Sequence, residues 1–242
     1  MTAKDMQDKI PLPICSVSGG KDSTALYLLM QEYYGNNFLP IFSDTGHEHP
    51  VTVNYVRNLH HMTRGPQVQI VKPDFTNAIA LRRKTRIENA RKAIGTTDYQ
   101  KALQMARKMK PSGNTFLDMM IWKNAVPTGK NQFCTEHLKL WPQFFFLTKN
   151  YPKDQYEWIM HSGIRAGESK ERQTKQPFSY NGFFDCLQVF AMLYESEQTM
   201  FQIMEERGVP PNPLYALGNS RVGCYPCIHA NKDQLNALPE WA

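Results

Sequence analysis

Short runs of β-forming residues alternate with longer helical patterns along the first third of the chain. Apolar residues run through 14–18, and residues 26–33 then repeat at helical spacing. Residues 38–43 predict a second strand, 53–60 a second helix and 67–71 a third strand. This β-α-β-α-β order predicts a doubly wound, parallel α/β sheet with right-handed crossovers.

The pattern changes between residues 75 and 130. Apolar positions recur only loosely there, and breaks near Gly95 and at 111–114 predict two or three basic helices. We expect residues 75–130 to be an insertion that lies over the mouth of the sheet. Residues 1–74 and 131–242 then form the α/β domain, in which Trp158–Ser162 is a further strand. The apolar run 183–194 reads as strand and then helix, and a last helix ends at Gly208.

The turn after the first strand carries the strongest chemical signal. It reads Ser18-Gly19-Gly20-Lys21-Asp22-Ser23 and leads directly into a helix. Glycines let backbone N–H groups close on an anion, and a helix N-terminus adds free N–H groups and a positive dipole. Lys21 brings a full charge, and the hydroxyls of Ser18, Ser23 and Thr24 can donate to phosphate oxygens. We therefore expect phosphate binding here, although the spacing differs from that of a Walker A loop.

Two further groups of polar residues suggest ligand sites. Asp44-Thr45-Gly46 follows the second strand, and ligands bind at the carboxyl ends of strands in such sheets. Cys224 and Cys227 form a Cys-x2-Cys knuckle, and Cys134 and His137 stand about ninety residues earlier. Three thiolates and one imidazole suit tetrahedral zinc, with His229 as a substitute for His137. A knuckle without metal is the alternative.

Composition narrows the class of protein. The chain has 242 residues, 41% of them hydrophobic, and no apolar run long enough for a membrane span. Residues 1–9 are polar and of mixed charge, unlike a signal peptide. Together with the nucleotide loop, this predicts a cytoplasmic protein without membrane contacts, in which five cysteines are metal ligands, reactive thiols or buried residues.

Charge is concentrated in the insertion. Residues 72–110 carry eleven lysines and arginines against three acids, while the whole chain has a net charge of +6. The basic residues within 82–110 could follow a nucleic-acid backbone, or they could simply form a solvated helical face. Aromatic residues are sparse in the basic segment 72–110 (Phe75 and Tyr99), which weakens a model of stacked single-stranded bases.

Four blocks in order resemble the phosphoadenosine phosphosulfate (PAPS) reductase family of the PP-loop adenine nucleotide α-hydrolase superfamily. The blocks are residues 18–23, 44–46, Gly163-Ile164-Arg165 with Glu168-Ser169 and Arg172, and Asn212–Tyr215 with residues 223–227. The resemblance implies that ATP or a PAPS-like nucleotide binds with Mg²⁺. The nucleotide would contact residues 18–24, Asp44, Thr45, Gly46, Gly163, Arg165 and Ser169.

The same resemblance suggests catalytic roles. Lys21, Asp44, Arg165, Glu168 and Arg172 would act on the nucleotide, with Asp44 and Gly46 near the adenosine or the metal. Arg165 and Arg172 would face the phosphate or sulfate end, because guanidinium forks match tetrahedral oxyanions. Glu168 would orient Arg165 or help to hold magnesium.

The cysteines match one branch of the family in part. In adenylyl-sulfate reductases, a Cys-Cys pair and a downstream Cys-x2-Cys hold a [4Fe–4S] cluster. Here Phe133 replaces the first cysteine of the pair, so Cys134, Cys224 and Cys227 carry over. The fourth position would be an open iron, Cys186 or, in a zinc site, His137. No cysteine follows Cys227, whereas PAPS reductases carry a catalytic one near the C-terminus, which favours ATP-dependent activation over thioredoxin-dependent reduction.

The sequence therefore predicts a PP-loop enzyme that acts at the α-phosphate or sulfo end of its nucleotide. Sulfur transfer from a sulfur donor protein, or adenylation of an acceptor with pyrophosphate release, fits best. A sulfonucleotide reductase or an ATP-sulfurylase-like protein is the alternative within the family. A non-catalytic nucleic-acid-binding module on the same fold is the alternative from another class.

Overall fold

A mixed sheet forms the centre of the computed structural model, which describes residues 9–92, 94–95, 97–230, 232 and 235. Its strands are β1 (Ile10–Val17), β2 (Leu39–Ser43), β3 (Gln69–Val71), β4 (Tyr156–Ser162), β5 (Phe178–Asn181) and β6 (Cys186–Val189). Their spatial order is β3-β2-β1-β4-β6-β5. All neighbouring pairs are parallel except β5 with β6. The α/β prediction is thus confirmed, with an antiparallel edge strand that the sequence did not indicate.

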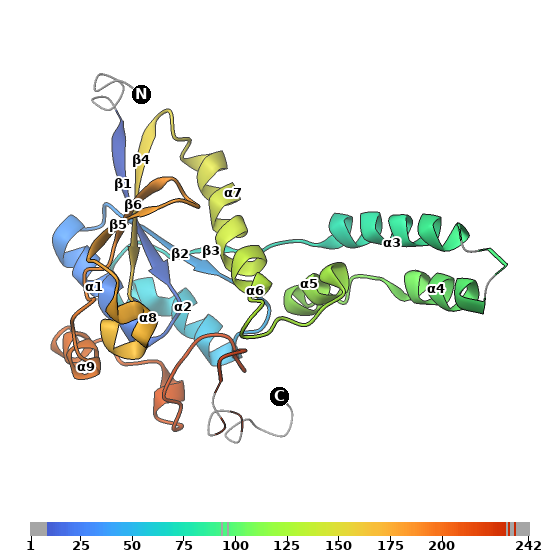
Figure 1. Cartoon of the computed structure of the whole chain (residues 1–242). Helices are drawn as coiled ribbons and strands as arrows, with labels where there is room; N and C mark the ends of the chain where they lie inside the picture. Colours follow the sequence, from blue (N-terminus) through green and yellow to red (C-terminus); the bar gives the residue numbers. More distant parts are fainter. Residues whose placement is uncertain (1–8, 93, 96, 231, 233–234, 236–242) are drawn as a thin grey trace.

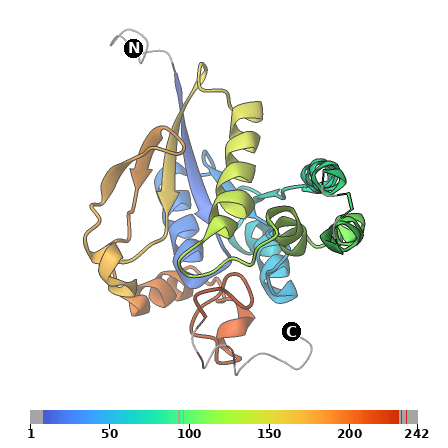
Figure 2. The ribbon, with the colours of Figure 1, turned by 45° about the vertical axis from the view of Figure 1, so that its right-hand side comes forward.

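Helices cover both faces of the sheet (Figure 2). The helices α1 (Lys21–Tyr34), α2 (Pro50–Thr63) and α9 (Glu197–Glu206) lie on one face, and α7 (Trp141–Asn150) lies on the other. Alternate residues of β1 supply both layers, because successive strand side chains point to opposite faces. Cys15 and Val17 join the core beneath α1 and α2, whereas Ile14 joins the core beneath α7.

The segment before α7 was not predicted as helical. It contains α6 (Phe133–Thr135) and a π-helix, η2 (Glu136–Leu140), which continues into α7. The Ser43 hydroxyl donates to the Lys139 carbonyl at 3.2 Å, and the Gln143 amide donates to the Ser43 oxygen at 3.0 Å. These bonds fix η2 against the carboxyl end of β2.

The apolar run 183–194 differs from its prediction in its second half. It forms β6 and then continues through turns, without the expected helix. Met192 and Leu193 are fully buried in these turns. The apolar residues of this run are therefore explained by burial, and they do not indicate a helix. The remaining short elements are η3 (Ala166–Glu168), α8 (Lys170–Gln173) and η4 (Pro213–Tyr215).

Two basic helices project from the body as an arm (Figure 1). They are α3 (Thr76–Arg91) and α4 (Thr97–Lys108), and α5 (Thr115–Lys123) follows at the base. The sequence interpretation placed this segment over the mouth of the sheet, but the arm extends sideways and packs on itself. Among its described residues, α3 buries only Ile79 and Ala90, so it has no apolar face with which to cover a sheet.

The arm is attached to the body by a small third core. Phe75, Ile79 and Met109 from the arm side pack with Met119 of α5, Phe133 and Leu138. No helix in the described part of the chain is both long and apolar enough to cross a membrane.

Candidate functional site

Residues 18–23, which we call the PP-loop, join β1 to α1. The helix begins at Lys21, directly after Gly20. Gly19 has φ +76°, and a Cβ there would come within 2.8 Å of the Thr52 methyl group and 2.9 Å of Val56. Only glycine fits this position without strain. Gly20 caps α1 without a side-chain bond, so apart from the Lys21 N–H, which donates to the Tyr215 hydroxyl, the N–H groups of the first turn are left for a ligand.

The loop hydroxyls mostly shape the loop itself. Ser23 Oγ accepts from the Ser18 N–H at 3.0 Å and lies 3.0 Å from the Gly20 carbonyl, to which it donates. Thr24 Oγ1 also donates to the Gly20 carbonyl, at 3.0 Å. Ser18 Oγ lies 3.0 Å from Ser23 Oγ and accepts from the Gly20 N–H at 3.4 Å, so all three hydroxyls predicted to bind phosphate already form bonds within the turn.

Residues 212–215 support the loop from behind. The buried Asn212 amide donates to the Gly19 carbonyl at 3.0 Å and to Thr52 Oγ1 at 3.3 Å. The Tyr215 hydroxyl accepts from the Lys21 N–H at 2.9 Å, and burial raises the pKa of Tyr215 to about 12. The fourth sequence block thus contacts the first, about 190 residues away, as a structural support.

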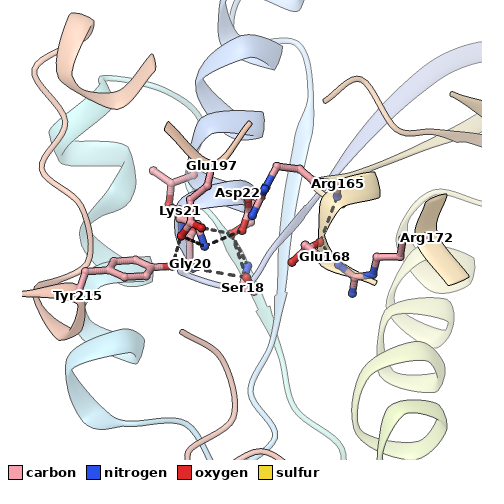
Figure 3. Close-up of polar contacts among 11 residues, drawn as sticks. Ser18, Gly20, Lys21, Asp22, Arg165, Glu168, Arg172, Glu197 and Tyr215 are labelled. Carbon is pink, nitrogen blue, oxygen red and sulfur yellow. Dashed lines mark hydrogen bonds and ion pairs between the residues drawn. The ribbon is translucent and has the colours of Figure 1, made fainter. Parts of the chain in front are cut away.

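Lys21 lies buried between acidic groups (Figure 3). Its ammonium is 3.1 Å from Glu197 Oε1 and 3.4 Å from Asp22 Oδ2, and it sits 5.5 Å from the centre of the Tyr215 ring. Glu197 is the first residue of α9, and the sequence analysis did not predict its ion pair with Lys21. These contacts hold the charge of Lys21 at the loop.

Arg165 is paired with the loop and does not point into open space. Its Nε is 2.5 Å from Asp22 Oδ1, and the whole residue is only 7% exposed. A Cβ on neighbouring Gly163 would come within 2.7 Å of the Asp22 carbonyl, so this loop packs tightly on the first turn of α1. Asp22 therefore bridges Lys21 and Arg165 (Figure 3).

Glu168 positions the second predicted arginine. Its Oε2 accepts from the Arg165 N–H at 3.1 Å and forms an ion pair with the Arg172 guanidinium. Ser169 caps α8 by accepting from the Arg172 N–H at 3.3 Å. Burial, and then the nearby positive charge of Arg221, lowers the pKa of Arg172. Arg221 was not recognised in the sequence, since nothing in its local pattern distinguishes it from other surface arginines.

Two adjacent cavities lie at this end of the sheet. One, of about 230 Å³, is lined by the PP-loop and by Arg172, Tyr215 and Arg221. The other, of about 250 Å³, lies over the carboxyl ends of β1, β2 and β4, with Lys139 and Cys224 in its wall. Both are lined by Ser16, Ser18 and Ser162. They sit where the strand order reverses between β1 and β4, the position at which ligands bind in such folds.

Asp44, Thr45 and Gly46 lie beside these cavities and outside their lining. Asp44 accepts from the Gly46 N–H at 2.9 Å and pairs with Lys72 at 3.2 Å. Thr45 is fully buried and donates to Glu48 at 2.7 Å. In this structure the block forms a turn whose polar groups are satisfied within the protein.

Cys227 lies near two of the other predicted thiols. Cys227 interacts electrostatically with both Cys134 and Cys224, while burial raises the pKa of each of these two partners. Cys224 forms an antiparallel bridge with Glu48, which brings the knuckle beside β2. Lys139 lies between the knuckle and the larger cavity, and was not recognised in the sequence.

Of the suggested fourth ligands, Cys186 and His137 lie away from the knuckle, whereas His229 lies beside it. Cys186 is buried in the core beneath α7, and His137 faces Trp122 with 4.8 Å between ring centres. Within the described residues, no three His, Cys, Asp or Glu side chains are arranged as a metal-binding group. His229 lines the small cavity beside the knuckle.

Comparison with known proteins supports the family resemblance that the four sequence blocks indicated. The model of the phosphoadenosine phosphosulfate reductase domain matches residues 12–230. An uncharacterised 37.8 kDa protein of Escherichia phage 186 is 36% identical over 234 residues, which cover 92% of this chain and 68% of that protein. An uncharacterised nin region protein of phage lambda is 29% identical over 170 residues.

The chain is shorter than some of its relatives. It spans 52% of the phage lambda protein and 40% of an uncharacterised Methanocaldococcus jannaschii protein that is 25% identical over 240 residues.

Two solved structures share the fold. A PAPS reductase from Candida auris, in a phosphate complex, superposes with a TM-score of 0.54 at 16% identity, covering 90% of this chain and 83% of that one. The FMN adenylyltransferase of Candida glabrata, with FAD and pyrophosphate, gives a TM-score of 0.51 at 13% identity, covering 88% and 54%. The family match over residues 12–230, with the PP-loop geometry, shows that this chain belongs to the phosphoadenosine phosphosulfate reductase family.

Proposed function

We propose that this chain is a PP-loop enzyme that binds ATP across the two adjacent cavities and adenylates an acceptor with release of pyrophosphate. The observation that carries the proposal is the charge around the smaller cavity. Lys21, Arg172 and Arg221 line it together with the N-terminal turn of α1. The repulsion between Arg172 and Arg221 is a cost that a bound polyphosphate would remove.

The larger cavity supports the placement of the nucleoside. It combines apolar walls from Phe42, Met160 and Phe184 with hydroxyl and amide groups, as small-molecule sites commonly do. Because the cavities share Ser18 and Ser162, a nucleotide lying across both would have its α-phosphate near the start of α1.

The reaction needs an acceptor oxygen that attacks the α-phosphorus. A new P–O bond forms, the bond from the α-phosphorus to the bridging oxygen breaks, and pyrophosphate leaves with that electron pair. The acceptor proton passes to solvent. Lys21 and the two arginines would stabilise the negative charge that develops on the leaving pyrophosphate. Asp22 would hold Lys21 in place and Glu168 would hold Arg172, because each carboxylate already forms an ion pair with that cation.

The comparisons favour this chemistry by analogy. The Candida glabrata neighbour is an adenylyltransferase that holds FAD and pyrophosphate, and the Candida auris neighbour holds phosphate. A PAPS-like nucleotide and reduction at the sulfo end are the second candidate, favoured by the family to which the chain belongs. Sulfur transfer from a donor protein would follow adenylation as a later step.

The test compares Lys21→Ala with Lys149→Ala, which removes an exposed lysine at the far end of α7. We expect Lys21→Ala to lower pyrophosphate release from ATP by about 100-fold or more, while Lys149→Ala behaves as wild type. Equilibrium binding of ATP and of PAPS, measured in parallel, identifies the preferred nucleotide without an acceptor. Equal ATP binding in wild type and Lys21→Ala, with no pyrophosphate released by either, would exclude the proposal.

A metal centre at the cysteines is a separate prediction. Because the described side chains are not arranged as a ligand set, no step above depends on one. Iron, sulfide and zinc content of anaerobically purified wild type and Cys224→Ser tests it. Metal that disappears in the variant would assign Cys224 as a ligand, whereas equal content in both would remove this prediction. Mg²⁺ accompanies ATP in the proposed reaction as part of the substrate.

A further inference from the structure

The arm and a groove at its base suggest what the acceptor is. The groove has a volume of about 670 Å³, larger than either nucleotide-site cavity. Aromatic side chains from three separate elements line it: Phe75 before α3, Trp122 on α5, and Trp141, Phe145 and Phe146 on α7. Of these residues only Phe75 belongs to the basic stretch 72–110, and the tertiary structure brings the other four from outside it.

The aromatic rings form flat surfaces in the groove. Phe75 and Trp122 stack with ring centres 5.4 Å apart, and Trp141 and Phe145 stack at 5.3 Å. Phe145 is 62% exposed although it is large and apolar. Stacked rings with an exposed member provide a surface on which an unpaired base can lie.

The arm beside the groove carries unbalanced positive charge. Its residues 76–108 hold nine lysines and arginines against two acids, a formal +7, whereas the whole chain is +6. Arg83, Lys84, Arg91 and Lys92 are exposed, and no carboxylate of the described chain forms an ion pair with the arm. Because α3 begins at Thr76, the basic helix starts directly at the aromatic groove.

A single helical segment separates the groove from the nucleotide cavity. His137 of η2 lines the groove, and Lys139, two residues later, lines the cavity over β1 and β2. Lys72 at the rim of the groove pairs with Asp44 at the carboxyl end of β2. A ligand in the groove would therefore lie next to the site at which ATP is proposed to react.

We propose that the arm and the aromatic groove bind a single-stranded segment of nucleic acid as the acceptor. The arm contacts the phosphates, and the groove holds one or two unstacked bases. Charge complementarity identifies the partner, since an apolar peptide or a second copy of this basic chain would leave the arm unneutralised. The role of the nucleic acid as acceptor rests on the proposed function. Its binding to the arm and groove does not depend on that function.

The test measures fluorescence anisotropy of the full chain with labelled 20-nucleotide single strands of DNA and RNA and with the DNA duplex. No ATP is present, so failure here leaves the ATP proposal intact. We expect single strands to bind more tightly than duplex, and the stronger of the DNA and RNA signals identifies the acceptor. Pyrophosphate release stimulated by that strand then connects the two proposals.

Two variants separate the contributions. Phe145→Ala should weaken single-strand binding about 5- to 150-fold without changing the salt dependence, and Phe145→Trp should restore it. Replacing Arg83, Lys84, Arg91 and Lys92 by Gln should lower the slope of log affinity against log salt by up to about 3. Phe178→Ala, an equally exposed phenylalanine on β5, and Gln at Arg57, Arg64, Lys149 and Lys175 are the matched controls.

Three results would overturn the inference. The first is unchanged single-strand affinity in Phe145→Ala. The second is duplex binding as tight as single-strand binding, which would assign the arm to non-specific charge attraction. The third is a wild-type dimer, seen by light scattering, that Phe145→Ala dissociates, because the groove would then be an interface between copies.

Discussion

The PP-loop and the arm are both rich in charge, but they differ in how that charge is balanced. Lys21, Arg165 and Arg172 each have a carboxylate partner within the fold, and Lys21 and Arg165 are buried. The arm's basic residues have no such partner in the described chain and are largely exposed. Paired, buried charge fixes geometry before a ligand arrives, whereas unpaired, solvated charge attracts a partner from outside.

Removal of the Asp22 carboxylate is expected to give the largest effect on stability, and it tests the contrast between paired and unpaired charge. Asp22→Ala leaves the buried Arg165 guanidinium without its carboxylate, so the free energy of unfolding should fall by about 3–5 kcal/mol. Urea unfolding measures it. Glu32→Ala, which removes from helix α1 the exposed carboxylate partner of Arg207, should leave the unfolding midpoint nearly unchanged. Equal losses in the two variants would contradict a special role for the buried pair.

A backbone change probes the rigidity of the loop. Gly19→Ala adds a Cβ at φ +76° that meets Thr52 and Val56, whereas Gly35→Ala adds one at φ +61° that meets nothing within 4 Å. Both positions have a positive φ, where an L side chain is strained, but only Gly19→Ala adds a close contact with α2. We expect Gly19→Ala to cost up to about 3 kcal/mol and to abolish ATP binding. If both variants bind ATP equally, the loop tolerates movement.

The pH dependence of stability distinguishes a buried histidine of the body from an exposed one. Burial lowers the pKa of His161 to about 4 from its usual value near 6.5. Between these pH values the unfolded chain binds the proton more readily, so stability should be complete above about pH 6.5 and fall towards pH 4. Allowing for solvent screening, the loss is about 2 kcal/mol. His161→Phe should flatten this dependence in urea titrations, and His61→Phe, at an exposed site on α2, should not.

The smallest effect is expected in the arm. Gln at Arg83, Lys84, Arg91 and Lys92 should change the free energy of unfolding by no more than about 0.5 kcal/mol, because exposed like charges contribute little to the fold. Thermal unfolding at low and high salt measures this. A loss comparable to that of Asp22→Ala would mean that the arm's charges are structural, and would remove the contrast with the PP-loop.

Local pattern was sufficient to predict the first half of the candidate nucleotide site. A β-run, two glycines and a helical repeat are adjacent in the chain, so neighbouring residues determine the turn and the free N–H groups of α1. The same reasoning gave the α/β class. It missed β5, an exposed edge strand, and α7, whose aromatic residues do not follow a simple helical stripe.

The partners of the site came only from tertiary structure. Glu197, Tyr215 and Arg221 reach the PP-loop from almost 200 residues away, and Asp22 turns out to hold Arg165. Sequence interpretation assigned Arg165 to the substrate and Ser23 to phosphate, but the structure uses both within the protein. The residue type determines which bonds a side chain can form. Only the fold determines which groups lie close enough to form them.

The sequence by itself determined the strand–loop–helix that could bind phosphate, the family to which the chain belongs, and the excess of positive charge in one segment. Tertiary structure alone decided that this segment projects as an arm, and that aromatic rings from 75, 122, 141 and 145 gather at its base. The physical reason is that periodicity and turn chemistry act over a few residues. Packing selects among distant partners by the free energy of burying them together.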